Sequence, residues 1–165
     1  MDSYNTKSAI HFNSERTASK AREIVIGTLN NMDTQFYFHD AINKTISLLT
    51  VDDTTLTIPE GVGCFLVHEM LDVASVLVKA LAVQIPKETF SFEFVGMDTY
   101  TEGWTEGKRK NGALIIKKTY FPDGYDKELD WDDYTTKEVI KNSLYSTNKT
   151  TGSSPNLAIM KSQKR

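Results

Sequence analysis

An apolar run from Val62 to Ile85, bounded by Gly61 and Pro86, most constrains how this chain can fold. The run is long enough for a helix of about six turns. Its polar residues recur roughly every 3.6 positions, which confines them to one narrow stripe and buries the other faces of the helix. Strand-like segments lie on both sides of the run, so the sequence predicts an α+β domain. The polar stripe consists of His68, Glu69, Asp72, Ser75 and Lys79.

Composition bounds the size and class of the protein. The chain has 165 residues, 39% hydrophobic and 25% charged, as is usual for a globular domain with a substantial core. We expect residues 8–145 to form one domain, between a loose N-terminus (1–7) and a flexible basic tail (146–165). Charged side chains in the central helix argue against a membrane span. Because the single cysteine, Cys64, excludes an internal disulfide framework, we expect a cytoplasmic protein.

The charge of the chain is unevenly distributed. Residues 146–165 carry 4 basic residues and no acidic one, whereas residues 1–145 carry 15 basic and 22 acidic residues, a net charge of −7. An acidic body repels the phosphates of nucleic acid, which dominate the affinity of most nucleic-acid-binding proteins. The charge therefore counts against a DNA or RNA partner without excluding one.

Hydrophobic periodicity and capping residues predict the order of the elements. Alternating apolar residues predict strands, and an apolar repeat between positions 18 and 29 predicts a helix that Asn13 or Ser14 caps. In chain order we expect a strand at 9–12, a helix at 14–29, a strand at 36–39, a strand at 45–51 extended by 54–58, the central helix, and a strand at 90–95.

The Asn-Gly pair at 111–112 is the clearest turn signal, because a type I′ turn needs positive φ at two successive residues. Folding the chain there predicts a hairpin of strands 104–110 and 113–120. In this register Glu106 lies opposite Lys117, and the opposite charges favour the pairing.

Downstream of the hairpin, Thr135 and Glu138 form the pattern of a capping box, which predicts a short helix at 136–145. The first six elements follow the split βαβ order of an antiparallel sheet with two helices on one face. In this order alone, residues 8–96 resemble ferredoxin-like domains (βαββαβ), including those in some small phage and plasmid proteins. The hairpin and the short helix are then C-terminal additions. Ferredoxin-like folds host unrelated activities, so the resemblance implies no particular function.

The segment 123–134 combines carboxylates with large aromatic side chains. Such a surface suits docking onto a basic protein partner, because charge steers the encounter and aromatic rings supply buried area. Trp104, within a repeated Thr-Glu-Gly sequence, is a further contact candidate. We therefore predict a non-catalytic, cofactor-free binding module, such as an inhibitor or adaptor encoded by a phage or plasmid; an ordinary acidic loop anchored by Trp131 is the alternative. The predicted partner-binding residues are Asp123, Tyr125, Asp126, Glu128, Asp130, Trp131, Asp132, Asp133, Tyr134 and Trp104.

A second interpretation is nucleic-acid binding by the sheet face opposite the helices. The predicted strands place histidine and tyrosine side chains on that face, where they could stack bases, next to a basic hairpin. The aromatic signature of RNA-recognition sheets is absent, however, and Glu93 on the same face would repel phosphate. The added hairpin, a protein partner or a second copy in a two-fold dimer could cover the face instead. The residues of this interpretation are His11, Tyr37, His39, Lys108, Arg109 and Lys110.

A third interpretation is a metal-dependent enzyme. His68 and Asp72 are four residues apart on the central helix, so both side chains can reach one metal ion, and Cys64 lies one turn earlier. The H-E-x-x-H pattern nevertheless lacks its second histidine, and a packed polar edge of the helix explains the same residues. We therefore assign no metal ligand, cofactor or catalytic residue, and expect a protein that is not an enzyme.

Overall fold

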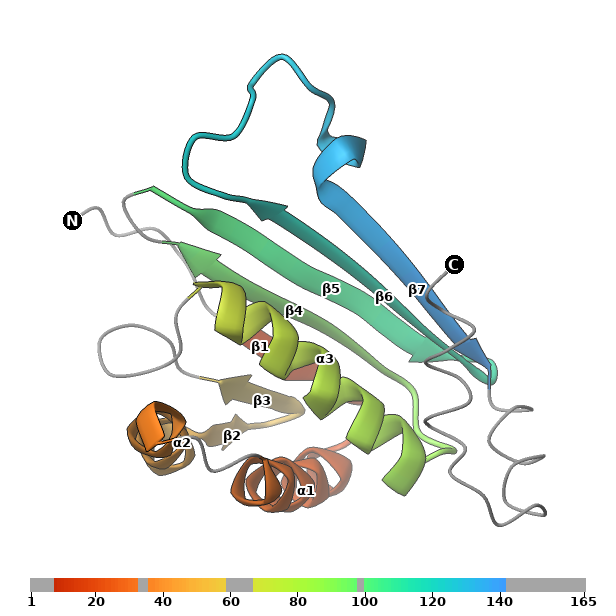
Figure 1. Cartoon of the computed structure of the whole chain (residues 1–165). Coiled ribbons are helices and arrows are strands. Elements are labelled where there is room, and N and C mark those ends of the chain that lie inside the picture. Colours follow the sequence, from red (N-terminus) through yellow and green to blue (C-terminus); the bar gives the residue numbers. More distant parts are fainter. Residues whose placement is uncertain (1–7, 33–35, 59–66, 98–99, 142–165) are drawn as a thin grey trace, which may run out of the picture.

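Strands from both halves of the chain join into one antiparallel sheet of seven strands, in the order β2-β3-β1-β4-β5-β6-β7 (Figure 1). The computed structural model describes residues 8–32, 36–58, 67–97 and 100–141. Within these residues, three α-helices lie on one face of the sheet. The strands are β1 (Ser8–His11), β2 (Thr50–Asp52), β3 (Thr55–Ile58), β4 (Phe90–Met97), β5 (Glu102–Lys110), β6 (Ala113–Phe121) and β7 (Thr135–Lys141). The helices are α1 (Glu15–Asn31), α2 (Phe36–Leu48), α3 (Val67–Gln84) and the short 3₁₀ helix η1 (Trp131–Tyr134).

Helix α1 confirms the first predicted helix. The Ser14 hydroxyl caps it by accepting a hydrogen bond from the Thr17 backbone N–H at 3.1 Å. The central helix is also confirmed over the residues of α3, whereas its predicted first turn at 62–66, with Cys64, lies outside the described residues. The predicted apolar face of α1 is buried throughout and consists of Ala18, Ala21, Val25 and Leu29.

The alternation in β4 directs three phenylalanines toward the helices and confirms this strand. Phe90, Phe92 and Phe94 are at most 2% exposed, and successive ring centroids lie 6.2 Å apart. On the next strand, Thr105 is buried and its hydroxyl donates to the Leu71 carbonyl of α3 at 3.2 Å. Even-numbered residues of β4 and odd-numbered residues of β5 therefore face the helices, and their neighbours in the strand face away from them.

The hairpin of β5 and β6 has the predicted turn and register. Asn111 and Gly112 adopt φ angles of 53° and 81°, as a type I′ turn requires. Glu106 lies opposite Lys117, so the cross-strand pairing expected from the charges is confirmed.

Residues 36–48 form helix α2 instead of the predicted strand at 36–39 and the first part of the strand at 45–51. Only β2 remains of the latter, and it pairs with β3 through a turn in which Asp53 has a φ of 59°. Four-residue alternation is a weaker signal than a longer helical repeat, and the helical repeat prevails here. The buried residues that show this repeat are Ala41, Ile42, Thr45 and Leu49.

The predicted last helix at 136–145 is wrong, because residues 135–141 form strand β7. β-Branched residues favour an extended chain, and β6 offers an open edge that pairs with the whole segment. Ile140 faces the core and is 2% exposed, whereas Val139 points to the other face and is 42% exposed. The expected Thr135 capping box does not form. A side chain bonds to the backbone in this way at η1 instead, where the Asp133 carboxylate accepts a hydrogen bond from the Asp130 N–H at 3.0 Å.

The α+β class is confirmed, but the ferredoxin-like topology is not, because the sheet has seven strands instead of four and three α-helices are described instead of two. The hairpin does not cover the sheet. β5 pairs with β4 along its edge, and β6 and β7 extend the same sheet. In the described part of the chain, the segment 122–134 covers the face opposite the helices only at one end, where its aromatic side chains pack on Trp104 and Phe121, and no α-helix lies over the rest of that face (Figure 1).

Candidate functional site

Five aromatic side chains gather at the end of the sheet where β5 begins and β6 ends. Phe121 lies at their centre, with ring centroids 4.9 Å from Tyr125, 5.2 Å from Trp131 and 5.2 Å from Tyr134. Trp104 meets the Phe121 ring edge-on at 5.9 Å and stacks on Trp131 at 5.2 Å with an interplanar angle of 25°. The structure thus brings together every aromatic residue of the predicted partner-binding set.

Hydrogen bonds hold the acidic segment over this cluster. The Tyr134 hydroxyl accepts a bond from the Asp126 N–H at 2.8 Å and donates to the Asp126 carbonyl at 3.2 Å. The Asp126 carboxylate accepts from the Glu128 N–H at 2.9 Å. The Thr135 hydroxyl donates to the Trp131 carbonyl at 2.8 Å, which joins η1 to the start of β7. The segment is therefore an organised loop that packs on aromatic side chains.

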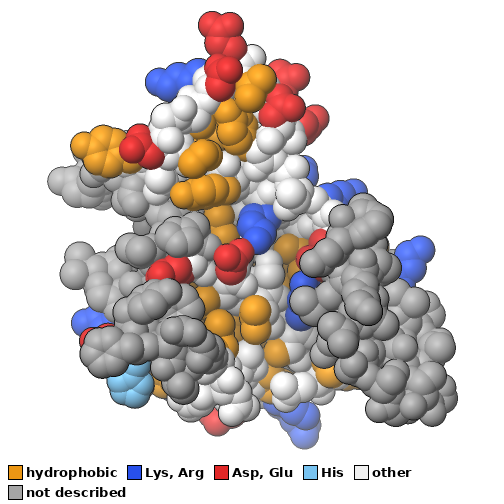
Figure 2. All heavy atoms as spheres, in the orientation of Figure 1, with side chains coloured by type: hydrophobic (Ala, Val, Ile, Leu, Met, Phe, Trp, Pro, Cys, Tyr) orange, Lys and Arg blue, Asp and Glu red, His pale blue; other side chains and the backbone are white. Residues whose placement is uncertain are grey.

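The outer side of this loop combines exposed apolar area with negative charge. Trp131 is 61% exposed and Leu129 is 49% exposed. In the described part of the chain, no lysine, arginine or histidine forms an ion pair with a carboxylate of the segment 123–134. Figure 2 shows hydrophobic side chains flanked by acidic ones over this upper end of the molecule. We call this surface the acidic–aromatic end; its exposed carboxylates are Asp123, Asp126, Glu128, Asp130, Asp132 and Asp133.

A hollow of about 410 Å³ lies beside the stacked indoles, on the sheet face away from the helices. The side chains of Trp104 and Glu106, two positions apart on β5, both point to this face. The Thr119 and Thr135 hydroxyls, 2.8 Å apart, bond to each other within it. The hollow is lined by Trp104, Glu106, Lys117, Thr119, Trp131, Asp132 and Thr135.

The residues predicted to bind nucleic acid are only partly brought together. His11 lies on the helix-free face as expected, with Nε2 2.8 Å from the Glu93 carboxylate and Nδ1 3.2 Å from the Thr55 hydroxyl. Tyr37 and His39 belong to helix α2, so their placement on this face was wrong. The His39 ring instead hydrogen-bonds with the Asn43 side chain within α2, at 3.1 Å.

The basic hairpin is likewise split between the two faces of the sheet. Arg109 is 2% exposed, and its guanidinium donates to the Pro86 carbonyl under the end of α3, so it is a core residue. Lys108 and Lys110 point to the helix-free face and are exposed. Sequence reasoning missed that Lys137 and Lys141 of β7 share this face, because this segment was expected to be helical.

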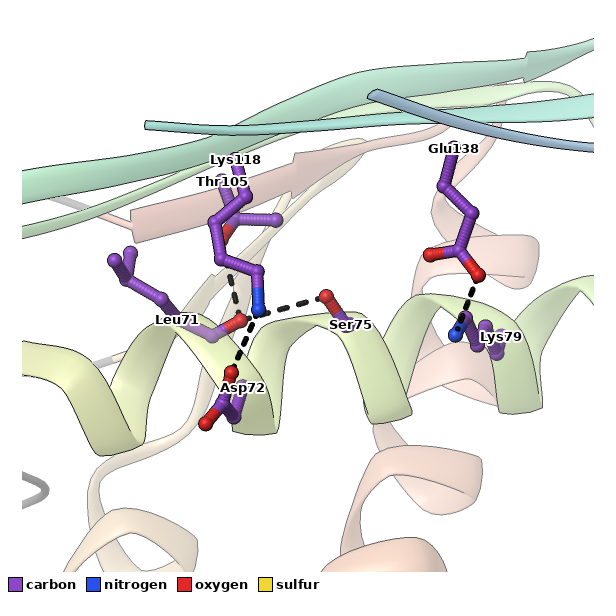
Figure 3. A network of polar contacts seen from close by, with 7 residues as sticks. All are labelled: Leu71, Asp72, Ser75, Lys79, Thr105, Lys118 and Glu138. Atoms are coloured by element: carbon purple, nitrogen blue, oxygen red, sulfur yellow. Dashed lines mark hydrogen bonds and ion pairs between the residues drawn. The ribbon is translucent and has the colours of Figure 1, made fainter. Parts of the chain in front are cut away.

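Two lysine–carboxylate ion pairs join α3 to the sheet (Figure 3). Lys118 Nζ of β6 lies 2.6 Å from Asp72 Oδ1, and Lys79 Nζ of α3 lies 3.0 Å from Glu138 Oε2 of β7. Asp72, one of the two residues considered for a metal, therefore has a cationic partner already. Among the described residues, no group of three His, Cys, Asp or Glu side chains is arranged to hold a metal ion.

Comparison with known proteins yields no relative: no protein-family model, curated protein or solved structure matches the chain. Within the described residues, none of the helices combines the length and the apolarity needed to cross a membrane.

Proposed function

We propose that the protein is a non-catalytic binding module that docks its acidic–aromatic end onto a basic surface of a protein partner. The observation that carries this proposal is the exposed Trp131, stacked on Trp104 and surrounded by carboxylates that have no ion-pair partner in the described residues. An inhibitor or an adaptor works in this way, by occupying a surface. The single cysteine, Cys64, supports action in a reducing compartment such as the cytoplasm.

The aromatic cluster supports a binding role because it is already organised. Trp131 is stacked on one side and held through its carbonyl by Thr135, so burying its free side on a partner costs little side-chain entropy. Tryptophan is among the residues most enriched at binding hot spots, where truncation costs about 2 kcal/mol or more. A pre-ordered indole with 61% of its surface exposed is a suitable anchor for such an interface.

The surrounding carboxylates supply orientation and association rate. Unpaired negative charges raise the rate of encounter with a basic surface and disfavour acidic partners by like-charge repulsion. Because these carboxylates are exposed, the attraction is screened by salt over about 8–10 Å. The proposal therefore implies a complex that forms more slowly at high salt but retains the apolar contact of Trp131.

The test is a quantitative pull-down by the tagged protein from a lysate of the native host, at low and moderate salt. In the variant Trp131→Ala/Asp132→Lys, a partner retained by the wild type should be lost. The Asp132 side chain makes no hydrogen bond or ion pair within the described residues, so Asp132→Lys breaks no contact of the loop, whereas Trp131→Ala removes the ring contacts with Trp104 and Phe121. The control Val83→Ala/Asp40→Lys changes an exposed apolar residue and an exposed acid on the helices. Equal retention by both variants would refute the acidic–aromatic end as the interface.

We also propose that β1 to β4, with α1 and α3, correspond to a ferredoxin-like core to which α2 and β5–β7 are added. The strand order β2-β3-β1-β4 and the antiparallel pairing of each neighbour support this relation. An experimental structure in which β1 does not lie between β3 and β4 would contradict it.

A further inference from the structure

The helix-free face of β5, β6 and β7 carries a concentration of positive charge, which we call the lysine face. Strand alternation and register place its residues in three adjacent rows across the strands. Within these rows the one acidic residue is Glu106. The exposed lysines of the face are Lys108 and Lys110 on β5, Lys117 on β6, and Lys137 and Lys141 on β7.

These lysines differ from those on the opposite face of the same strands. Facing the helices, Lys118 pairs with Asp72 and Glu138 pairs with Lys79. On the lysine face, no lysine has an ion pair within the described residues, and Lys117 lies directly opposite Lys137 in the register of β6 and β7. Like charges opposite each other destabilise a sheet. A bound anion would relieve that repulsion.

The shape of the surface favours an anion that carries flat unpaired rings. The hollow beside Trp131 adjoins the row of Glu106, Lys117 and Lys137 on the same face. At about 410 Å³ it has room for one base, and Trp131 offers a π-face on which a base can stack. The carboxylates of Glu106 and Asp132 are acceptors for exocyclic amino groups of bases. A base paired in a duplex is not free to enter the hollow.

We propose that the lysine face binds single-stranded nucleic acid, with phosphates on the lysines and one unpaired base in the hollow against Trp131. This site shares Trp131 and Asp132 with the acidic–aromatic end proposed to dock a protein, but its lysines lie outside that end. The whole chain has a net charge of −3. Because salt screens charges beyond about 8–10 Å, the nearby lysines determine the electrostatic attraction of the nucleic-acid phosphates to this face. The carboxylates beyond Trp131 then limit the site at that end by repelling phosphate.

The test is fluorescence anisotropy with the full chain and a labelled mixed-sequence oligonucleotide of about 12 nucleotides, as DNA and as RNA, between about 50 mM and about 200 mM salt. The double variant Lys117→Glu/Lys137→Glu should weaken binding at least about tenfold and reduce the salt slope by about 1.4, because two phosphate contacts are lost. Trp131→Ala should weaken binding on the order of tenfold, and Trp131→Phe less, because phenylalanine keeps a stacking ring.

The matched control is Lys20→Glu/Lys44→Glu, which makes the same change in net charge on exposed positions of α1 and α2. This control should bind the oligonucleotide within about threefold of the wild type, and circular dichroism should show that both variants are folded. Equal weakening by both double variants, or no binding by the wild type at low salt, would overturn the proposal.

Two further outcomes separate single-stranded nucleic acid from other anions. A duplex of the same sequence that binds as tightly would overturn the role of the unpaired base. Polyglutamate is the competitor, added at the same concentration of negative charge as the oligonucleotide. If it displaces the oligonucleotide, the site accepts any acidic chain, including an acidic protein, and the proposal is overturned. Because Lys117→Glu/Lys137→Glu leaves the acidic–aromatic end unchanged, loss of oligonucleotide binding with retained partner capture distinguishes this site from the proposed protein interface.

Discussion

Phe121 should be the residue that holds the acidic–aromatic end in place. Its side chain is 5% exposed and its ring contacts the rings of Trp104, Tyr125, Trp131 and Tyr134. Truncation of a buried phenylalanine to alanine costs about 3–5 kcal/mol, and each aromatic pair adds about 0.5–1.5 kcal/mol beyond the area that it buries. Because the cluster lies at the end of the sheet and can partly collapse, we expect Phe121→Ala to cost about 3 kcal/mol, near the lower limit.

Urea denaturation followed by circular dichroism measures this cost. The near-ultraviolet spectrum of the native variant should also change, because the Trp104–Trp131 stack rests against the ring that is removed. Phe121→Leu is the matched control: it keeps most of the apolar volume but not the ring, so it should cost less than Phe121→Ala while changing the aromatic spectrum as well. If Phe121→Ala lowers the free energy of unfolding by less than about 1 kcal/mol and leaves the aromatic spectrum unchanged, the ring does not organise the loop as we argue.

Two other parts of the fold give stability predictions. Gly107→Ala should cost several kcal/mol, roughly 3 or more, since a Cβ there would lie 1.9 Å from the Ile115 carbonyl oxygen. Gly27→Ala in α1 has nothing within 4 Å and should stabilise the protein by about 0.5–1 kcal/mol, so thermal unfolding of the two variants should shift in opposite directions. Ser14→Ala should cost about 1 kcal/mol by removing the cap on the Thr17 N–H, while Ser14→Asp should retain most of the stability; equal losses would contradict the capping role.

Local patterns predicted the elements whose partners lie nearby in the chain or whose periodicity is long. The apolar repeat of α1, the alternating phenylalanines of β4 and the Asn111-Gly112 turn are signals of this kind, and each is confirmed. The four-residue alternation at 36–39 was misleading, because these residues open helix α2, whose buried positions recur with a helical period from Ala41 to Leu49. Short windows do not contain enough residues to distinguish a period of 2 from one of 3.6.

The error at β7 affected the candidate site as well as the fold. Residues 135–141 are extended because β6, paired with β5 along one edge, offers its other edge to them. With β7 as a strand, Lys137 comes opposite Lys117. With α2 as a helix, Tyr37 and His39 leave the sheet. The two errors of secondary structure therefore removed residues from the predicted nucleic-acid surface and left others out of it. The prediction of the aromatic segment 123–134 did not depend on either error.

The sequence by itself determined the α+β class, the hairpin and its register, and the clustering of carboxylates with aromatic residues in one segment, because all of these depend on residues close in the chain. Only the tertiary structure decided that Trp104 stacks on Trp131, that Arg109 is buried under α3 while Lys108 and Lys110 are exposed, and that lysines from three strands share one face. The physical reason is that strand pairing joins residues far apart in sequence, and each strand then assigns alternate side chains to opposite faces of the sheet.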